Sequence, residues 1–542
     1  MRSRLALLVP LAIACGSEAA QKVDTAPPTW GGEVQQLVAD HCTDCHHAGG
    51  AAPFALQTWE EAAPLAEALV SAVDAGRMPP WSADPDCRSY EGERLLSAED
   101  RDLLRAWADG GALEGEPVEA IVPRSDTLEA DLVLMAEEAY TPDFSTSADD
   151  YRCQFLGHDF DTETWVTASQ VVPGDAQVHH VLVFTLTGSQ IDTAEALAAD
   201  EQGPGYTCFS GPVPAGESAV PEGGLPGQVG AWVPGALPLV HDPGQAVRVP
   251  AGARLVMQVH YSAQGSEALA SASSLRLQTT DVQPEQLIVT RPLPVYDFLI
   301  PAGDPTASAT HRFTNWSDDT LRLETVAPHL HLLGTEATAT VVHADDSREC
   351  LLDVPDWDFA WQQAYRLHDD DHLELAPGDA VEVTCTWDNS AANQPVVDGQ
   401  QVEPQDVVWG EGTADEMCLV YLGGVEPYTP APDASAPTCA AACGPSDSWD
   451  DLLSCPEMSA TCLPCAFDAL LTCTQSACGL ELAAAQSCIE TCGLDTLVLG
   501  GAPGDCMQAT CPELTADLLS CADAVDPGES CEDAVDACDL TL

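Results

Sequence analysis

Hydrophobic positions follow two different patterns along this chain, helical at first and β-like afterwards. In the first part, apolar residues recur at helical spacing over residues 30–41 and 97–107. The second of these segments begins with Ser97 as its predicted N-cap, carries acidic residues in its first turn, and ends before Gly110. The pattern therefore predicts an all-helical N-terminal domain.

From about residue 127 onwards, short runs of alternating apolar and polar residues are separated by Gly- and Pro-containing turns. The runs fall at 163–168, 178–186, 245–249, 254–261 and 274–279, and then at 310–315, 321–326, 336–342 and 380–387. Many short strands with turn signals between them favour antiparallel sandwiches. We therefore expect two β-sandwiches in tandem between residues 120 and 430, with their boundary near 285–300.

Length and charge limit the possible architectures and partners. The chain has 542 residues, too many for one ordinary domain. It carries 18 Lys and Arg residues against 87 Asp and Glu residues, a net charge of −69. Such acidity repels nucleic acid and anionic membrane surfaces, so neither is an expected partner. The hydrophobic share of 45% is sufficient for packed cores.

The N-terminus has the pattern of an export signal. Arg2 and Arg4 precede a short apolar run, and residues 1–14 are too short an apolar segment to span a membrane. Residues 12–16 resemble a bacterial lipobox, which would leave a lipid on Cys15 at the start of a linker over 15–29. Cleavage near Ala19 is the alternative. With 23 cysteines, the chain is expected in an oxidising compartment. We expect an exported protein, periplasmic or at the cell surface, whose lipid on Cys15 would anchor it to the outer membrane.

A CxxCH motif lies directly after the first predicted helix. Its thiols, Cys42 and Cys45, are spaced for covalent attachment of a c-type haem, and His46 follows as a ligand of the haem iron. Met78 lies at a suitable distance downstream for the second axial ligand, a pairing that raises the iron potential. Zinc is the competing interpretation for a cysteine pair, but no second CxxC lies nearby. Residues 30–117 thus resemble a small cytochrome c.

Histidines gather in the β-rich region. His179 and His180 are adjacent within a predicted strand, so they can bind one ion only where the strand ends or its backbone turns. Imidazole suits copper and zinc, whereas a thioether favours Cu(I). Two mononuclear copper sites of different softness are therefore expected. The full set of predicted ligands is His179, His180 and His260 for one ion and His329, His331 and Met417 for the other.

Four segments carry a resemblance to a known family. The segments VHHVLVF, LVMQVHYS, PHLHLLG and GTADEMC occur in the order found in the type II copper, ascorbate-dependent monooxygenases, which include peptidylglycine α-hydroxylating and dopamine β-monooxygenases. The resemblance implies two jelly-roll-like sandwiches, at 118–290 and 291–430. It also implies that the three-histidine site stores an electron, whereas the site with Met417 binds O2 and attacks the substrate. Residues 357–365 and 388–390 also resemble the family, and we interpret them as structural.

The same comparison suggests substrate preferences. Tyr421 matches a substrate-contacting tyrosine of the family and is included among the catalytic residues with the ligands of the second site. Peptide-amidating members carry an arginine and an asparagine where this chain has Ala327 and Leu419. A peptide carboxylate is therefore not expected, and a less charged, apolar or aromatic molecule is favoured. Gln258 matches a position between the two sites, and His241 is an alternative ligand of the first site.

Cysteines outside the CxxCH motif are expected to form disulfides. Cys153 is expected to pair with Cys208, and Cys385 with Cys418, whereas the sequence leaves open whether Cys87 and Cys350 pair. After a linker at 431–438, residues 439–542 contain fourteen cysteines and no histidine. This composition predicts a disulfide-stapled helical module that serves stability or protein contacts.

Taken together, the motifs predict an exported copper-dependent monooxygenase. It would hold two copper ions and one covalently bound c-type haem, and it would hydroxylate a C–H bond of a small organic substrate with O2. An ascorbate-like reductant or a redox protein would supply electrons, and the fused haem would pass them on. The first alternative is a copper and haem electron-transfer or copper-binding surface protein without hydroxylase activity. The second is a cell-surface interaction protein with inert sandwiches.

Overall fold

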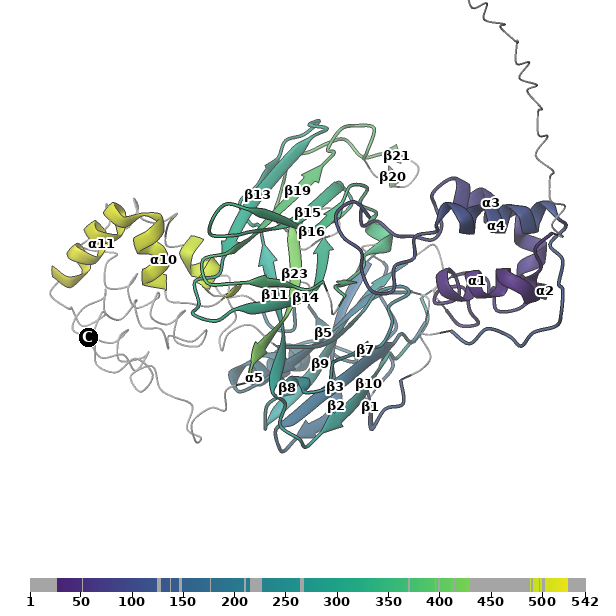
Figure 1. Cartoon of the computed structure of the whole chain (residues 1–542). Coiled ribbons are helices and arrows are strands. Elements are labelled where there is room, and N and C mark those ends of the chain that lie inside the picture. The colour runs from purple at the N-terminus through teal and green to yellow at the C-terminus, as the bar shows by residue number, and fades with distance from the viewer. Residues whose placement is uncertain are drawn as a thin grey trace, which may run out of the picture.

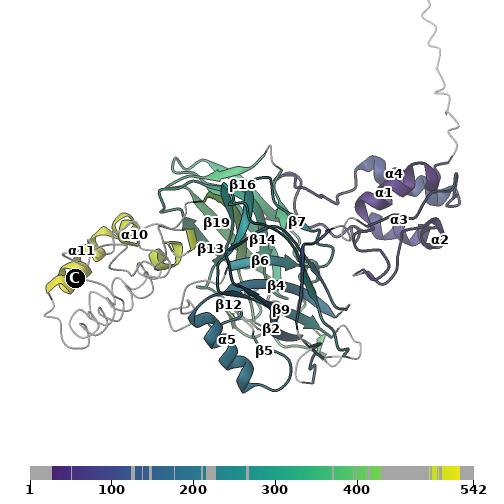
Figure 2. The same cartoon turned by 90° about the horizontal axis from the view of Figure 1, so that it is seen from below.

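The structure is a computed structural model in which most of residues 27–428 and part of the C-terminal region are described. The described range 27–428 has gaps at 51, 124–127, 137, 146–148, 176, 209–210, 215–226, 264–267, 369–370, 395, 398–399, 411 and 413–414. Beyond it, the structure describes residues 488, 491–496, 498–499 and 503–524. The predicted signal, the lipid site Cys15, the linker 431–438 and most of the Cys-rich module lie outside the described residues. Figures 1 and 2 show a helical unit on one side of a β-rich body and further helices on the other.

The N-terminal unit is helical, as the pattern predicts. Its elements are η1 (Trp30–Val34), α1 (Gln35–His41), α2 (Trp59–Ala62), η2 (Ala63–Leu65), α3 (Ala66–Asp74) and α4 (Ala98–Asp109). Ser97 caps α4 in a capping box with Asp100, which satisfies two backbone N–H groups at the helix start. Trp30 and Trp107 are fully buried and their ring centroids lie 6.0 Å apart, so the first and last helices pack on each other.

The first sandwich packs a five-stranded sheet against one half of a longer sheet. The five-stranded sheet has the order β5 (Tyr206–Thr207), β2 (Asp149–Phe160), β9 (Ala253–Ser262), β4 (Val178–Leu186) and β6 (Gly227–Trp232). Facing it are β1 (Leu132–Met135), β10 (Ser274–Thr280), β3 (Thr164–Val172), β7 (Leu239–Val240) and β8 (Gln245–Val249). Aliphatic side chains from both sheets form one buried core. Helix α5 (Ser189–Asp200) follows β4.

The second sandwich uses the other half of the long sheet. Its strands are β11 (Gln286–Pro294), β23 (Leu419–Pro427), β14 (Leu321–His329), β17 (Tyr365–Arg366) and β18 (Leu373–Leu375). They face a four-stranded sheet of β13 (Ala307–Thr314), β19 (Ala380–Trp387), β15 (Gly334–Val342) and β16 (Arg348–Val354). Short pairs join β12 (Leu299–Ile300) to β22 (Val407–Val408) and β20 (Val396–Val397) to β21 (Gln400–Gln401), and η4 spans Phe359–Trp361.

One sheet runs through both sandwiches. Strand β11 pairs in parallel with β8 of the first sandwich and antiparallel with β23 of the second. The predicted β-sandwich content is confirmed, but the sequence pattern does not show that the two sandwiches share a sheet. Because paired strands lie about 4.8 Å apart, this pairing fixes how closely side chains from the two sandwiches approach each other.

Disulfides join segments within and between these units. The predicted pairs Cys153–Cys208 and Cys385–Cys418 are confirmed. Cys87 and Cys350, whose pairing the sequence leaves open, form a third bridge. Among the described residues only Cys42 and Cys45 are free thiols. These bridges indicate an oxidising compartment and therefore an exported protein.

The described part of the C-terminal module lies against the second sandwich. Helices α10 (Pro503–Thr510) and α11 (Pro512–Ala524) are joined to residues 488–492 by the bridges Cys488–Cys511 and Cys492–Cys506. The Asp495 carboxylate accepts hydrogen bonds from the Thr314 amide and the Trp316 indole of the sandwich. Val498 and Leu499 are buried in the core of the second sandwich. No helix in the described part of the chain is long and apolar enough to cross a bilayer.

We expect the double substitution Cys385→Ala, Cys418→Ala to lower the free energy of unfolding by about 2–4 kcal/mol. The bridge closes a chain separation of 33 residues and both cysteines are fully buried. Denaturant unfolding of the exported protein measures the loss. The pair Cys153–Cys208 spans 55 residues and is the matched comparison, because loop-closure entropy differs by only about 0.5 kcal/mol between the two lengths. A double variant as stable as the native protein would contradict this expectation.

Candidate metal centre

A β-bulge brings the two adjacent histidines to the same side of their strand. In the pairing of β4 with β9, Val178 lies opposite Tyr261 and His180 lies opposite His260, so His179 is an extra residue with no partner of its own. An inserted residue of this kind breaks the alternation of side chains across a strand. The bulge is the local turn of the backbone that a shared ion requires of adjacent histidines.

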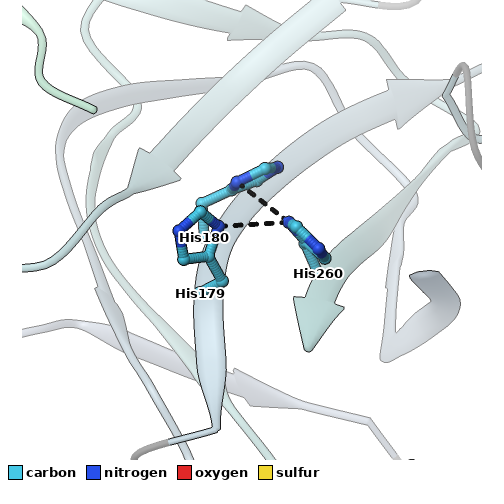
Figure 3. Close-up of side chains that lie close together, drawn as sticks. All are labelled: His179, His180 and His260. Atoms are coloured by element: carbon cyan, nitrogen blue, oxygen red, sulfur yellow. Dashed lines mark hydrogen bonds between the residues drawn. The ribbon is translucent and has the colours of Figure 1, made fainter. Parts of the chain in front are cut away.

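Three imidazoles therefore converge on one point. The Nδ1 atom of His260 lies 3.2 Å from Nδ1 of His179 and 3.4 Å from Nδ1 of His180. Figure 3 shows the three rings turned toward one another from β4 and β9. All three side chains are buried, and one nitrogen of each lies within 4.8 Å of the others. This arrangement can hold a metal ion through the three Nδ1 atoms.

Two residues of β2 fix the His260 ring. The Oδ1 atom of Asp149 lies 2.9 Å from His260 Nε2, and the Tyr151 ring stacks on the imidazole with centroids 4.1 Å apart. If Nδ1 of His260 binds a metal, Nε2 carries the proton and donates it in a hydrogen bond to the Asp149 carboxylate. Such a carboxylate orients a histidine ligand and raises its basicity. No local sequence pattern indicates this role of Asp149.

The second pair of histidines offers the opposite nitrogens. Nδ1 of His329 lies 2.8 Å from Oε1 of Gln362, and Nδ1 of His331 lies 3.1 Å from the Asp415 carbonyl oxygen. Because both oxygens can only accept, each Nδ1 carries the ring proton and donates a hydrogen bond to its oxygen partner. Each Nε2 is then the nitrogen with a free lone pair. His329 ends β14 and His331 follows it on a turn. Both Nε2 atoms are available as metal ligands.

Register places Met417 beside this pair. His329 lies opposite Leu419 in the pairing of β14 with β23, so the chain two residues further on, at His331, approaches Met417. Met417 is buried. The neighbouring Glu416 carboxylate accepts hydrogen bonds from the amides of His331 and Leu333. Burial raises the pKa of Glu416 to about 7, while the hydrogen bonds it accepts oppose that rise.

The two groups of histidines lie next to each other where the sandwiches meet. The ring centroids of His180 and His329 are 6.0 Å apart. Phe359 contacts both groups, with its ring 5.1 Å from that of His179 and 6.1 Å from that of His331. Residues 357–365, interpreted above as structural, pack against the histidine cluster through Phe359, and Gln362 orients the His329 ring.

Burial favours the neutral form of four of these imidazoles, those of His179, His180, His329 and His331. It lowers the pKa of His179 to about 4 and that of His329 to about 3, and neighbouring histidines add to the effect. The pKa of His180 is also lowered well below its ordinary value, mainly by burial. A neutral imidazole is the form that binds a metal ion, so no proton has to be removed first at neutral pH.

The other sequence-predicted residues have varied surroundings. Gln258 is buried and its amide donates to the Cys208 carbonyl, next to the Cys153–Cys208 bridge. His241 does not belong to the group formed by His179, His180 and His260, and its buried Nε2 has no hydrogen-bond partner. Tyr421 lies opposite Ala327 across β14 and β23, two pairs away from His329 and Leu419.

The CxxCH motif lies at the end of α1. Cys45 and His46 are buried, whereas Cys42 is half-buried. Burial raises the pKa of the Cys42 thiol to about 12 and also raises that of Cys45. Nδ1 of His46 lies 3.1 Å from the Phe54 carbonyl oxygen, and the Phe54 ring packs on the imidazole at 4.5 Å. This hydrogen bond orients the ring and leaves Nε2 for an axial ligand bond. The position of Met78 relative to His46 stays a prediction.

We expect the metal-free protein to lose stability as pH falls below 6.5, in part through His179. Between about pH 4 and 6.5 the unfolded chain binds a proton at His179 that the folded chain does not bind. This difference costs about 1.4 kcal/mol per pH unit. In His179→Gln, the free energy of unfolding measured in urea should therefore fall less steeply as the pH is lowered. The slopes of the two proteins should differ by up to about 1.4 kcal/mol per pH unit. Parallel pH curves for the two proteins would contradict the buried, neutral state.

We expect Asp149→Ala to weaken Cu(II) binding at the three-histidine group by about 10–100-fold, the usual effect of removing a carboxylate that orients a ligand. Titration against a competing chelator, followed by EPR, measures the affinity. Asp159→Ala is the matched control, because Asp159 lies on the same strand and its side chain is 80% exposed. Equal affinities in the two variants would show that Asp149 does not support the ligand.

Likeness to solved structures is weak. The major capsid protein P2 from bacteriophage PM2 aligns with 55% of this chain and 98% of its own, at 9% identity and a TM-score of 0.23. The VP2 subviral particle of infectious bursal disease virus aligns with 56% of this chain and 73% of its own, at 13% identity and a TM-score of 0.14. Scores this low support no argument about fold or function. No curated protein matches the chain significantly.

A family model gives the informative match. Residues 314–450 match the C-terminal domain of the copper type II ascorbate-dependent monooxygenases. This range includes His329, His331 and Met417, but neither the three-histidine group nor the helical unit. The family is one of oxidoreductases that use copper, O2 and a reductant. The match therefore supports membership of the second sandwich in the copper type II ascorbate-dependent monooxygenase family.

Proposed function

We propose that the protein is an exported copper-dependent monooxygenase that hydroxylates a C–H bond of a small organic molecule. The observation that carries the proposal is the pair of histidine groups where the sandwiches meet. One group presents three Nδ1 atoms and the other has two Nε2 atoms free. The three-histidine group and His331 are buried and His329 is half-buried. Hydrogen bonds to oxygen acceptors orient the rings of His260, His329 and His331 before any ion binds.

The donor set fits two copper ions of different softness. Three imidazoles from His179, His180 and His260 suit a copper ion that cycles between its two oxidation states. The imidazoles of His329 and His331 with the Met417 thioether favour Cu(I), the form that reacts with O2. Copper at these positions would supply two single electrons for O2 activation, one from each ion.

The chain also provides a surface for the substrate next to His329. Ala327 and His329 point to the same face of β14, and their partners Tyr421 and Leu419 lie directly opposite on β23. None of these four residues carries a charge at neutral pH, because the pKa of His329 is lowered to about 3 by burial. A small apolar or aromatic molecule fits it better than a peptide carboxylate does, and we assign Tyr421 to contact with that molecule.

We further propose that the helical unit is a c-type cytochrome domain. Cys42 and Cys45 are free thiols in a chain whose other described cysteines are bridged. They are protonated, because burial raises their pKa values, whereas zinc binding needs thiolates. His46 has Nε2 free for iron, and Met78 is the expected second ligand. A haem held there would supply a one-electron carrier within the same chain.

Export and anchoring complete the proposal. Disulfides among the described residues agree with an oxidising compartment. The lipid on Cys15 would hold the protein at the outer membrane, facing the periplasm or the outside of the cell. Substrate, O2 and an ascorbate-like reductant or redox protein would then reach it from that compartment.

A second candidate is a copper and haem electron-transfer protein without hydroxylase activity. The observation that favours it is the position of Phe359, whose ring packs against a histidine of each group. Such a ring leaves less room there for an organic substrate. The two candidates differ in one respect that can be measured, because only the first consumes O2 in proportion to an added substrate.

We expect the copper-loaded protein to consume O2 when an apolar or aromatic substrate and ascorbate are both supplied. Met417→Ala should lower this rate at least about a hundredfold, since even an indirect support of a ligand is worth 10–100-fold. Its EPR spectrum should keep the signal of the three-histidine copper. His241→Gln is the control and should keep both copper ions and the full rate. Consumption of O2 that does not depend on substrate would favour the electron-transfer candidate.

A further inference from the structure

The chain between α3 and α4 leaves the helical unit and packs on the second sandwich. We call residues 79–94 the strap. Its Cys87 is bridged to Cys350 on β16, over a sequence separation of 263 residues. The Tyr90 hydroxyl, which is buried, donates to the Leu351 carbonyl at 2.9 Å, and the Asp84 amide donates to the Asp353 carbonyl at 2.8 Å. The strap thus follows β16 through covalent and hydrogen bonds.

A second set of contacts ties the strap to β17. Trp81, Tyr90 and Tyr365 form an aromatic cluster with ring centroids 5.1 to 6.4 Å apart. The amide of Glu91 donates to the Arg366 carbonyl, and the Glu91 carboxylate lies 3.0 Å from Nε of Arg366. Both ends of the strap are therefore fixed to the second sandwich.

One contact connects the strap to a predicted metal ligand. Nε2 of Gln363 donates to the Pro80 carbonyl at 3.0 Å, and the neighbouring Gln362 holds Nδ1 of His329 at 2.8 Å. Both glutamine side chains are buried, each with 7% exposure, so water does not compete for these hydrogen bonds. Pro80 itself is two residues from Met78, the expected iron ligand. A short series of peptide and hydrogen bonds thus runs from Met78 to His329.

The helical unit also contacts the first sandwich, through the face that carries the CxxCH motif. Arg94, at the end of the strap, is buried and donates to the Gly235 carbonyl. Gly235 has φ +81° and approaches so closely that a Cβ there would lie 2.6 Å from the Cys45 sulfur. Only a glycine permits this approach without strain. The cysteine pair therefore faces the copper-binding sandwiches.

We propose that the strap is a clamp, fixed to the second sandwich, that holds the CxxCH face against the first, so that electrons would pass from the helical unit to the copper sites within one chain. The inference rests on the proposed function, because it takes the helical unit as a c-type cytochrome. In each transfer, a ferrous haem held by Cys42, Cys45 and His46 would lose one electron and a cupric ion would gain it, and no bond would form or break. The contact of Gln363 with Pro80 makes the His329 site the one connected to the strap.

Hydrogen exchange tests the clamp without any redox chemistry. In Cys87→Ser, Cys350→Ser combined with Gln363→Leu, the amides of 42–46 and 233–236 should exchange at least about tenfold faster, because the local opening that exposes them becomes easier. Amides of β9 and α4 should keep their protection. Ser89→Ala, an exposed position in the strap, is the matched control and should exchange as the native protein does. Unchanged exchange at both segments would overturn the clamp.

Anaerobic rapid mixing then tests whether the clamp supports electron transfer from haem to copper. In the full chain loaded with Cu(II) and carrying reduced haem, the haem should reoxidise at a rate that does not depend on protein concentration. In the triple variant at Cys87, Cys350 and Gln363, haem reoxidation should be at least about tenfold slower. Copper and haem contents are measured in the same samples. Equal rates in the two proteins, or a native rate that rises with concentration, overturn the clamp and leave the monooxygenase proposal intact. A native haem that copper does not reoxidise overturns the electron supply in the proposed function as well.

Discussion

The parallel pairing of β8 with β11 is the constraint on which the candidate centre depends. His179, His180 and His260 belong to one sandwich and His329 and His331 to the other, so no single sandwich contains the cluster. Because β11 also pairs with β23, which pairs with β14, the backbone hydrogen bonds of one sheet set the separation between the two groups. A flexible linker between independent domains would leave that separation free to vary.

Five imidazoles gathered in a largely buried space would be costly without oriented partners. The chain supplies a different oxygen acceptor to each of three rings, from Asp149, Gln362 and the Asp415 carbonyl. For His260, His329 and His331, those acceptors also decide which nitrogen stays free, Nδ1 in the first sandwich and Nε2 in the second. The nitrogens that these three histidines offer therefore differ because of their neighbours, since their imidazole side chains are the same.

Sequence patterns predicted the parts that depend on local chemistry. Alternation located β4 and β9, and helical spacing located α1 and α4. The sequence could not show contacts set by distant pairing, such as the bridge from Cys87 to Cys350, because nothing local links residues so far apart. The same holds for Asp149, whose position beside His260 follows from the register of β2 on β9. Two adjacent histidines that share an ion require a strand end or a turn of the backbone, and the strand pairing shows that this turn is a β-bulge at His179.

The strap also changes how the domains of this chain are to be counted. Its residues are continuous with the helical unit in sequence, yet their buried side chains complete the surface of the second sandwich. Excising the helical unit along its sequence boundaries would strip Tyr90 and Ala83 from the core of another domain and leave Cys350 without its partner. The two units are therefore not interchangeable modules. A recombination event that moved one of them alone would leave an unfilled surface, so they are expected to be inherited together.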